Sequence, residues 1–139
     1  MINIISGENG LGKTKKLIDI ANESIKTSSG TTVFINNGNK LMYDIHHDVK
    51  LIDIKQYNIN NIDRLYGFIC GIYANNYDTS NIIWDNTFNL SKFSNEELYN
   101  FLLKLHYFSK EANVNFFLSL SSNINDLPDD IKNISNIIQ

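Results

Sequence analysis

The chain has 139 residues, the size of one domain, and 42% of them are hydrophobic, which is enough to bury an ordinary core. Its net charge of -3 argues against non-specific binding to nucleic acid, and its single cysteine, Cys70, excludes an internal disulfide. The first residues lack the pattern of a signal peptide and no apolar run is long enough to span a membrane, so we expect a cytoplasmic protein. The abundance of Asn, Ile and Lys favours a bacterial or phage source.

The first part of the chain alternates strand and helix patterns. Residues 2–6 form an apolar run that ends at a glycine, which predicts a strand, and an amphipathic helix pattern follows the glycines. Residues 28–30 end that helix, and residues 31–35 predict a second strand. After a turn signal, residues 40–46 fit either a hairpin strand, because apolar residues alternate, or one helical turn. We favour the hairpin.

The middle of the chain predicts two buried strands with a helix between them. Residues 49–54 and 81–85 are apolar enough for such strands, and the helix begins at Asn61. Gly67 and Gly71 lie four residues apart on this helix. We interpret them as sites of close packing against the sheet.

The last part of the chain predicts a helix, a strand and a helix. Ser94 and Glu97 form a capping box at the start of the first helix, and residues 114–120 predict a strand. Pro128 opens a short final helix, whose inward-facing residues are Ile131, Ile134 and Ile138. Strands that alternate with helices predict an α/β fold, a three-layer sandwich with a mostly parallel five-stranded sheet. We see no linker or internal repeat, so we predict a single domain over residues 1–139.

A glycine-rich segment at residues 7–14 matches the phosphate-loop pattern G-x-x-x-x-G-K-[ST] at every fixed position. Its glycines let successive main-chain N–H groups point at phosphate oxygens, and the following helix directs its positive end at the same anion. Lys13 is expected to reach the β- and γ-phosphates, and the Thr14 hydroxyl to bind Mg²⁺. The residues predicted to bind nucleotide are Gly7, Glu8, Asn9, Gly10, Leu11, Gly12, Lys13, Thr14 and Lys15.

With its flanking strand and helix, this segment resembles the P-loop NTPase superfamily. The resemblance covers residues 1–27 and implies a doubly wound α/β sandwich that holds the nucleotide at the carboxyl ends of the strands. Over the same segment the chain is similar to small P-loop proteins of low-GC Gram-positive bacteria, which are loosely grouped with twitching-motility (pilus-retraction) ATPases. It is shorter than the two-domain retraction motor and lacks the acidic and histidine boxes of that motor.

A second motif, Ile82-Ile83-Trp84-Asp85, resembles a Walker B strand, whose terminal Asp meets Mg²⁺ through water. We therefore predict Asp85 as a metal-binding residue beside Thr14, and the alternative is an Asp that begins a turn. The next residue is Asn86 instead of the water-orienting glutamate of many P-loop ATPases, and an amide cannot accept a proton at neutral pH. Arg64 is the only arginine, hence the only candidate for an internal arginine finger. We predict slow hydrolysis or none.

Two further polar clusters are candidate sites. Ser119 or Ser121 stands where ATPases of the additional-strand group carry a polar residue that senses the γ-phosphate, and the alternative is a polar strand end. His46 and His47 are adjacent, and adjacent side chains on a strand point to opposite faces. With no cysteine or third histidine nearby, we do not expect them to share a metal ion.

Three functions remain open from the sequence. The first is an ATP-binding module that acts as a switch or as a subunit of a larger assembly, with a protein partner or with further copies of itself. The second is a small-molecule kinase resembling the type II thymidine kinases, although Asn86 and the lone Cys70 depart from the glutamate and the four-cysteine zinc lasso of that family. The third is a degenerate P-loop fold kept for interaction, against which the intact Lys13 and Thr14 argue. The lack of an Asn-Lys-x-Asp guanine signature favours ATP over GTP.

Overall fold

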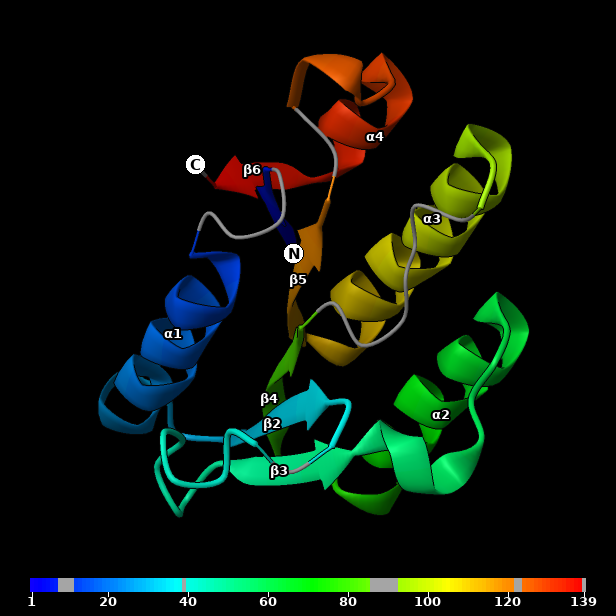
Figure 1. The fold of residues 1–139 in the computed structure, drawn as a ribbon. Coiled ribbons are helices and arrows are strands. Elements are labelled where there is room, and N and C mark those ends of the chain that lie inside the picture. Colours follow the sequence, from blue (N-terminus) through cyan, green and yellow to red (C-terminus); the bar gives the residue numbers. More distant parts are fainter. Residues whose placement is uncertain (8–11, 39, 86–92, 122–123, 139) are drawn as a thin grey trace.

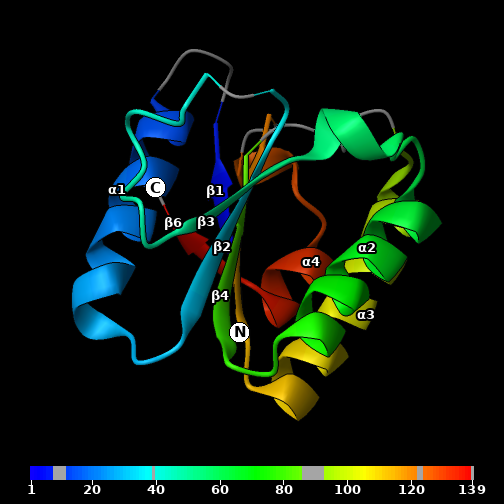
Figure 2. The same ribbon diagram turned by 90° about the horizontal axis from the view of Figure 1, so that it is seen from below.

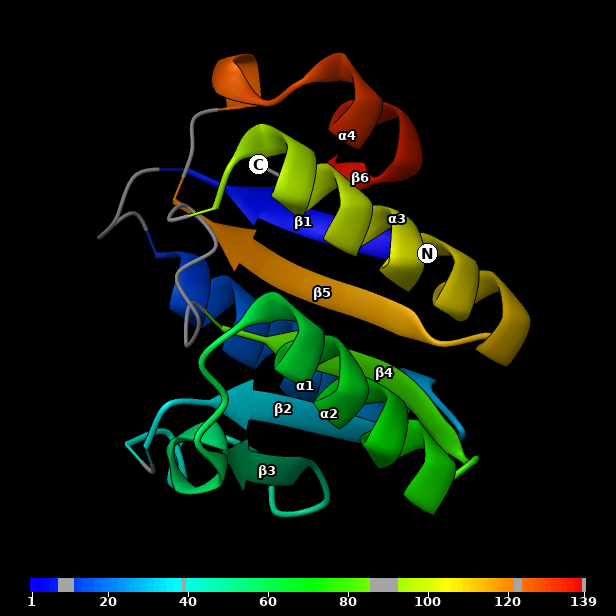
Figure 3. The same ribbon diagram turned by 90° about the vertical axis from the view of Figure 1, so that its right-hand side faces the viewer.

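The computed structural model describes residues 1–7, 12–38, 40–85, 93–121 and 124–138. In these residues one six-stranded sheet has the strand order β3-β2-β4-β5-β1-β6, and every strand pair is parallel (Figure 3). The strands are β1 (Ile2–Ser6), β2 (Thr31–Asn36), β3 (Lys50–Asp53), β4 (Thr79–Trp84), β5 (Asn115–Leu120) and β6 (Asn136–Ile138). The α-helices are α1 (Lys13–Thr27), α2 (Ile62–Asn75), α3 (Asn95–Ala112) and α4 (Asp129–Ile134), and short 3₁₀ helices lie at Ile54–Tyr57 and Ile124–Asp126.

Helices cover both faces of the sheet, so the molecule has three layers (Figures 1 and 2). Helix α1 lies on one face, and α2, α3 and α4 lie on the other. Each face has its own group of buried apolar side chains, with Leu17 and Ala21 from α1 on one side and Leu65, Leu102 and Ile131 on the other. A parallel sheet buried on both faces explains why its strands are almost continuously apolar. The predicted α/β class and parallel sheet are confirmed.

The sheet has six strands, so the prediction of five was wrong at the carboxyl terminus. Ile138 was expected on the inner face of the last helix, but α4 ends at Ile134 and Ser135 is extended. Residues 136–138 then pair with β1, with Ile138 opposite Ile5. Ile138 packs inward from a strand, because the main chain of β1 has hydrogen-bonding groups on this side that residues 136–138 satisfy.

The hairpin favoured for residues 40–46 is also wrong. These residues form turns, in which the N–H groups of Asp44 and Ile45 donate to the carbonyl of Leu41, so the alternative of one helical turn is closer. Ile45 is buried against the core on the α1 side and Leu41 packs partly buried beside it, whereas Tyr43 is 90% exposed, so the alternation of apolar residues does not correspond to one buried face. His46 and His47 therefore do not lie on a strand, and their rings stack with centroids 4.4 Å apart instead of pointing to opposite faces.

Helix α2 begins where it was predicted, with Asn61 as its N-cap, but its glycines do not pack closely. A Cβ atom added at Gly67 or Gly71 would meet no heavy atom within 4 Å. The buried residues of the helix are Leu65 and Ile69, and a position two residues further along points about 200° away from them. The two glycines consequently lie on the exposed side of α2, and the interpretation of close packing is wrong.

The capping box that was predicted for α3 is confirmed. The Ser94 hydroxyl accepts a hydrogen bond from the Glu97 N–H at 3.1 Å, and the Glu97 carboxylate accepts one from the Ser94 N–H at 3.3 Å. The helix buries Leu98, Phe101, Leu102 and Leu105 against the sheet. None of the helices in the described ranges combines the length and apolar character needed to cross a bilayer.

Candidate functional site

The described ends of the glycine-rich segment lie at the carboxyl edge of the sheet, with Gly7 after β1 and Gly12 before α1. Gly7 follows β1 with φ 149°, and Gly12 is the N-cap of α1 with φ 79°, backbone conformations that favour glycine. Glu8, Asn9, Gly10 and Leu11 lie outside the described residues, so their predicted contacts to nucleotide stay predictions. The two ends of the segment have the conformations that its glycines were expected to allow.

Lys13, the first residue of α1, directs its side chain into the edge of the sheet. Its Nζ donates to the carbonyl oxygen of Gly7 at 2.6 Å and to that of Leu120 at 3.1 Å. The residue is only 8% exposed. Burial lowers the pKa of Lys13, and the neighbouring Asp85 opposes part of this shift by favouring the charged form. The ammonium group is thus fixed between the ends of β1 and β5.

Thr14 and Asp85 meet directly, although 71 positions separate them in the sequence. The Thr14 hydroxyl donates to Asp85 Oδ2 at 2.9 Å. The hydroxyl of Ser119, near the end of β5, donates to Asp85 Oδ1 at 3.4 Å. All the predicted metal-binding oxygens and one of the two predicted sensor residues therefore lie in one hydrogen-bonded group.

The strand order explains this convergence. Strand β5 lies between β1, which precedes the glycine-rich segment, and β4, which ends just before Asp85. Neighbouring strands are about 4.8 Å apart, so the ends of β1 and β4 are about 10 Å apart. The side chains of Lys13 and Thr14 span this distance from the first turn of α1. Strand β5 is consequently an additional strand between the two motif-bearing strands.

Lys15 differs from its neighbours in the predicted site. Its side chain is 83% exposed and forms an ion pair with Asp19 at 3.8 Å, one turn further along α1. A contact between Lys15 and a bound phosphate would therefore come from its main-chain N–H, which lies in the first turn of the helix.

Within the described residues, no arginine finger and no water-orienting residue is found beside Lys13 and Asp85. The guanidinium of Arg64 donates to the carbonyl of Asn58 and to the side chain of Asn60, both in the connection that precedes α2. Asn86 lies outside the described residues. Arg64 is thus engaged within its own connection, and nothing described brings it to Lys13 or Asp85.

The carbonyl groups of Gly7 and Leu120, which accept hydrogen bonds from Lys13, were not predicted from the sequence. A main-chain carbonyl belongs to every residue, so no residue type marks it in a sequence. Only the parallel pairing of β1 with β5, with Ser6 opposite Leu120, shows that these carbonyls flank the lysine.

Comparisons with known proteins give the fold but not a family. No model of a known protein family matches the sequence, and no curated protein sequence is similar to it. Among solved structures, the fold is similar to that of C. elegans PCH-2, with a TM-score of 0.54 and 10% sequence identity. The match covers 99% of this chain and 34% of PCH-2, so the chain spans about a third of that protein. At this identity the similarity shows the fold alone.

Proposed function

We propose that this chain is a P-loop protein that binds a nucleoside triphosphate, with ATP as the preferred nucleotide, at the edge of the sheet formed by Gly7 to Thr14. The observation that carries the proposal is the convergence of Lys13, Thr14 and Asp85 beside a segment that matches the phosphate-loop pattern. In the parallel α/β fold, which is similar to that of PCH-2, the described ends of this segment lie at the carboxyl edge of a parallel sheet, where such folds bind ligands.

The electrostatics of α1 favour an anion at its amino terminus. The N-cap, Gly12, supplies no side-chain hydrogen bond, and the first turn contains no acidic residue. Lys13, Lys15 and Lys16 instead add positive charge to the positive end of the helix dipole, which is unfavourable without a counter-charge. By contrast, α3 is capped by Ser94 and has two glutamates in its first turn. A triphosphate at α1 would supply the missing acceptors and charge.

The donor set fits Mg²⁺, which prefers oxygen ligands and keeps several waters. Thr14 offers a hydroxyl and Asp85 a carboxylate, and their oxygens are already 2.9 Å apart. When bound, Mg²⁺ would neutralise charge on the β- and γ-phosphates. Thr14 and Asp85 would hold the ion, Lys13 would bind the phosphates, and Ser119 would orient the Asp85 carboxylate.

We further propose that hydrolysis is slow, so that the protein acts as a nucleotide-dependent switch or as a subunit of a larger assembly. Asn86 follows the Asp85 carboxylate where a general base would be needed, and an amide cannot take up a proton from water. Arg64, the single arginine of the chain, is hydrogen-bonded within the connection before α2. A cytoplasmic, bacterial setting remains a prediction from the sequence.

Titration calorimetry with ATP and Mg²⁺ tests the proposal. Lys13→Ala should weaken binding by about ten- to a hundredfold, because a hydrogen bond to a charged group contributes about 1.5–3 kcal/mol. Lys16→Ala is the matched control, since it removes an equal charge from the same helical turn at an exposed position. Chelation of Mg²⁺ should also weaken binding. Unchanged affinity in Lys13→Ala would contradict the proposed site.

Phosphate release tests the second part independently. The purified protein should release phosphate from ATP at a rate close to the background without enzyme. Rapid release that Lys13→Ala abolishes would contradict slow hydrolysis while leaving nucleotide binding intact.

A further inference from the structure

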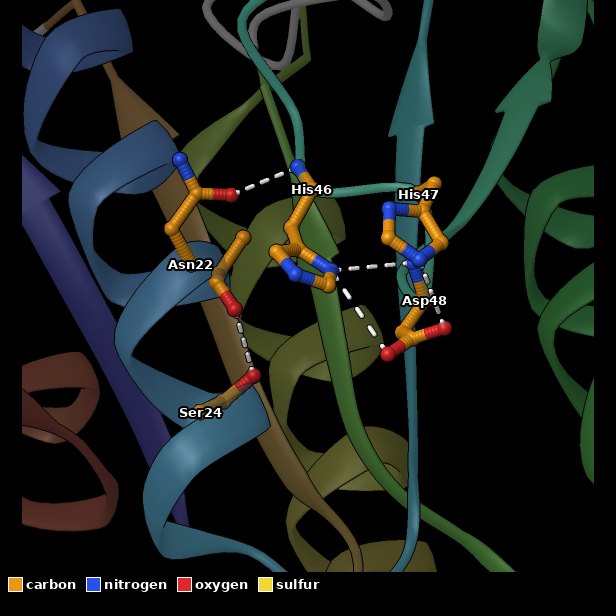
Figure 4. Close-up of polar contacts among 6 residues, drawn as sticks. Asn22, Ser24, His46, His47 and Asp48 are labelled. Carbon is orange, nitrogen blue, oxygen red and sulfur yellow. Dashed lines mark hydrogen bonds and ion pairs between the residues drawn. The ribbon is translucent and has the colours of Figure 1, made fainter.

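The turn before β3 brings two imidazole rings and a carboxylate together (Figure 4). One ligand atom from each of His46, His47 and Asp48 lies within 4.8 Å of the other two. His46 Nδ1 is 3.8 Å from Asp48 Oδ2, and His47 Nε2 is 3.5 Å from Asp48 Oδ1. The rings stack with an interplanar angle of 23°. We call these three residues the His–His–Asp cluster.

The main chain around this cluster is held by α1 and by the core. The side chain of Asn22, on α1, donates to the carbonyl of Asp44 at 3.0 Å. It also accepts a hydrogen bond from the His46 N–H at 2.8 Å (Figure 4). The N–H of Val49 donates to the carbonyl of His46 and closes the turn. Ile45 and Val49, on either side of the cluster, are 7% and 5% exposed. The backbone that presents the cluster is therefore fixed before any ligand binds.

We propose that the His–His–Asp cluster binds a divalent transition-metal ion, with Zn²⁺ as the occupant. Two imidazole nitrogens and a carboxylate oxygen are ligands that Zn²⁺ accepts, whereas Mg²⁺ prefers oxygen alone. Ligands at about 2.0–2.2 Å from a tetrahedral ion are about 3.3–3.6 Å from one another. The distances from His46 and His47 to Asp48 are close to this spacing, although they end on different carboxylate oxygens. Because the two rings are stacked, side-chain rotations must turn both nitrogens toward one ion.

The hydrogen bonding of His46 suits a ligand. Its Nδ1 accepts a 3.1 Å hydrogen bond from the Asp48 N–H, so the lone pair of this nitrogen points toward Asp48. An ion would take the place of this contact. With three protein ligands, the fourth position of a tetrahedral ion remains for water or for a ligand from a partner.

The surroundings of the cluster are acidic. A hollow of about 520 Å³ beside His46 lies between α1 and the residues 43–46. The hollow is lined by three carboxylates, Asp19, Glu23 and Asp44, and by one lysine, Lys26. Asp48 of the cluster adds a fourth carboxylate, and Lys15, paired with Asp19, adds a second lysine. The net negative charge raises the local concentration of cations.

The cluster is separate from the nucleotide site. Asn22, which anchors the turn, comes nine residues after Lys13 on α1 and so lies about 13 Å further along the helix. No residue of the cluster belongs to the proposed nucleotide site. The inference therefore stands independently of the proposed function.

Titration calorimetry of the full chain with Zn²⁺ alone, without nucleotide, tests the proposal. We expect one ion per chain, and His47→Gln or Asp48→Asn should weaken binding by more than about tenfold, since loss of an outer-shell partner alone costs ten- to a hundredfold. His106→Gln is the matched control, because it removes the one remaining histidine, on α3. Its affinity should equal that of the wild type.

Cobalt provides a second readout. Co²⁺ at the cluster should give visible absorption bands that Zn²⁺ displaces and that excess Mg²⁺ does not. Both variants replace exposed side chains, so the circular dichroism spectrum should stay unchanged. If Zn²⁺ binds His47→Gln as tightly as the wild type, or fails to bind the wild type, the cluster is a surface ion pair and the proposal is wrong.

Discussion

Lys13 combines two properties that oppose one another in the protein without nucleotide. Its ammonium group is nearly buried, and burying a charge costs free energy unless polar groups surround it. The carbonyl groups of Gly7 and Leu120 supply that compensation and hold the side chain at the edge of the sheet. Burial still lowers the pKa of Lys13, which is the direction expected when this compensation is incomplete. A bound polyphosphate would complete it.

The lowered pKa predicts how stability changes at alkaline pH. Between the pKa of Lys13 in the folded protein and its ordinary value of 10.5, the unfolded chain binds more protons than the folded protein. The cost of burying the charge is therefore present at neutral pH and is relieved as the pH rises through this interval. Relative to Lys13→Met, the free energy of unfolding of the wild type should rise with pH in this interval.

Urea unfolding at a series of pH values up to about 10.5 measures this difference. Lys16→Met, at an exposed position on the same turn, should follow the wild-type curve. A constant difference between wild type and Lys13→Met across the interval would contradict the argument.

The connection from α1 to β2 packs tightly against the one that precedes β4. The Thr31 N–H donates to the carbonyl of Asp78 at 2.8 Å, and the hydroxyls of Ser28 and Ser80 are 2.7 Å apart. A Cβ atom on Gly30 would lie 2.4 Å from the Asp78 carbonyl oxygen, well inside van der Waals contact. Gly30 is thus required for close approach, whereas Gly67 on α2 is not.

The two glycines predict substitutions of opposite sign. Gly30→Ala should lower the free energy of unfolding by about 1–3 kcal/mol, because the added methyl group forces the two connections apart. Gly67→Ala should raise it by about 0.4–1 kcal/mol, because alanine has less freedom in the unfolded chain and meets no neighbour on the exposed side of the helix. Urea unfolding compares both with the wild type. Equal effects would show that the two sites are packed alike.

The sheet lies between two groups of buried apolar side chains, one on each face. We propose that both groups unfold together with the sheet as one cooperative unit. Leu17 of α1 packs on one face and Leu102 of α3 on the other, and both are fully buried. The strands between them contribute to both sides, with Ile82 facing one core and Ile83 the other. Loss of packing on either face should consequently destabilise the same structure.

Leu17→Ala and Leu102→Ala test whether the two cores unfold in one cooperative transition. Each should cost about 2–5 kcal/mol through lost burial and the cavity that remains. Both should shift a single transition, seen alike by circular dichroism and by the fluorescence of Trp84, which packs edge-on against Phe101. A second transition in Leu17→Ala would contradict the prediction of a single domain over residues 1–139.

Strands and helices were largely predictable because their patterns are local. Each successful prediction depended on a pattern only a few residues long. Examples are the apolar runs of β4 and β5, the N-cap Asn61 and the capping box that begins at Ser94. Prediction failed where apolar residues are buried without the expected repeat. Ile45 is buried from a turn, and the partly buried Ile138 packs against the same core from a short edge strand. The inward packing of Ile138 was predicted, but the strand that achieves it was not, and residues 40–46 were expected in a hairpin and not in turns.

The motif at residues 7–14 and the terminal Asp85 could be found in the sequence because residue type and spacing carry them. Their proximity was expected only from the resemblance to P-loop NTPases, because it depends on β5 lying between β1 and β4, and strand order is set by pairing between distant segments. The carbonyls that hold Lys13 and the turn that gathers His46, His47 and Asp48 arise in the same way. Local patterns record which residues are buried and which can turn, whereas the contacts between elements depend on how the whole chain packs.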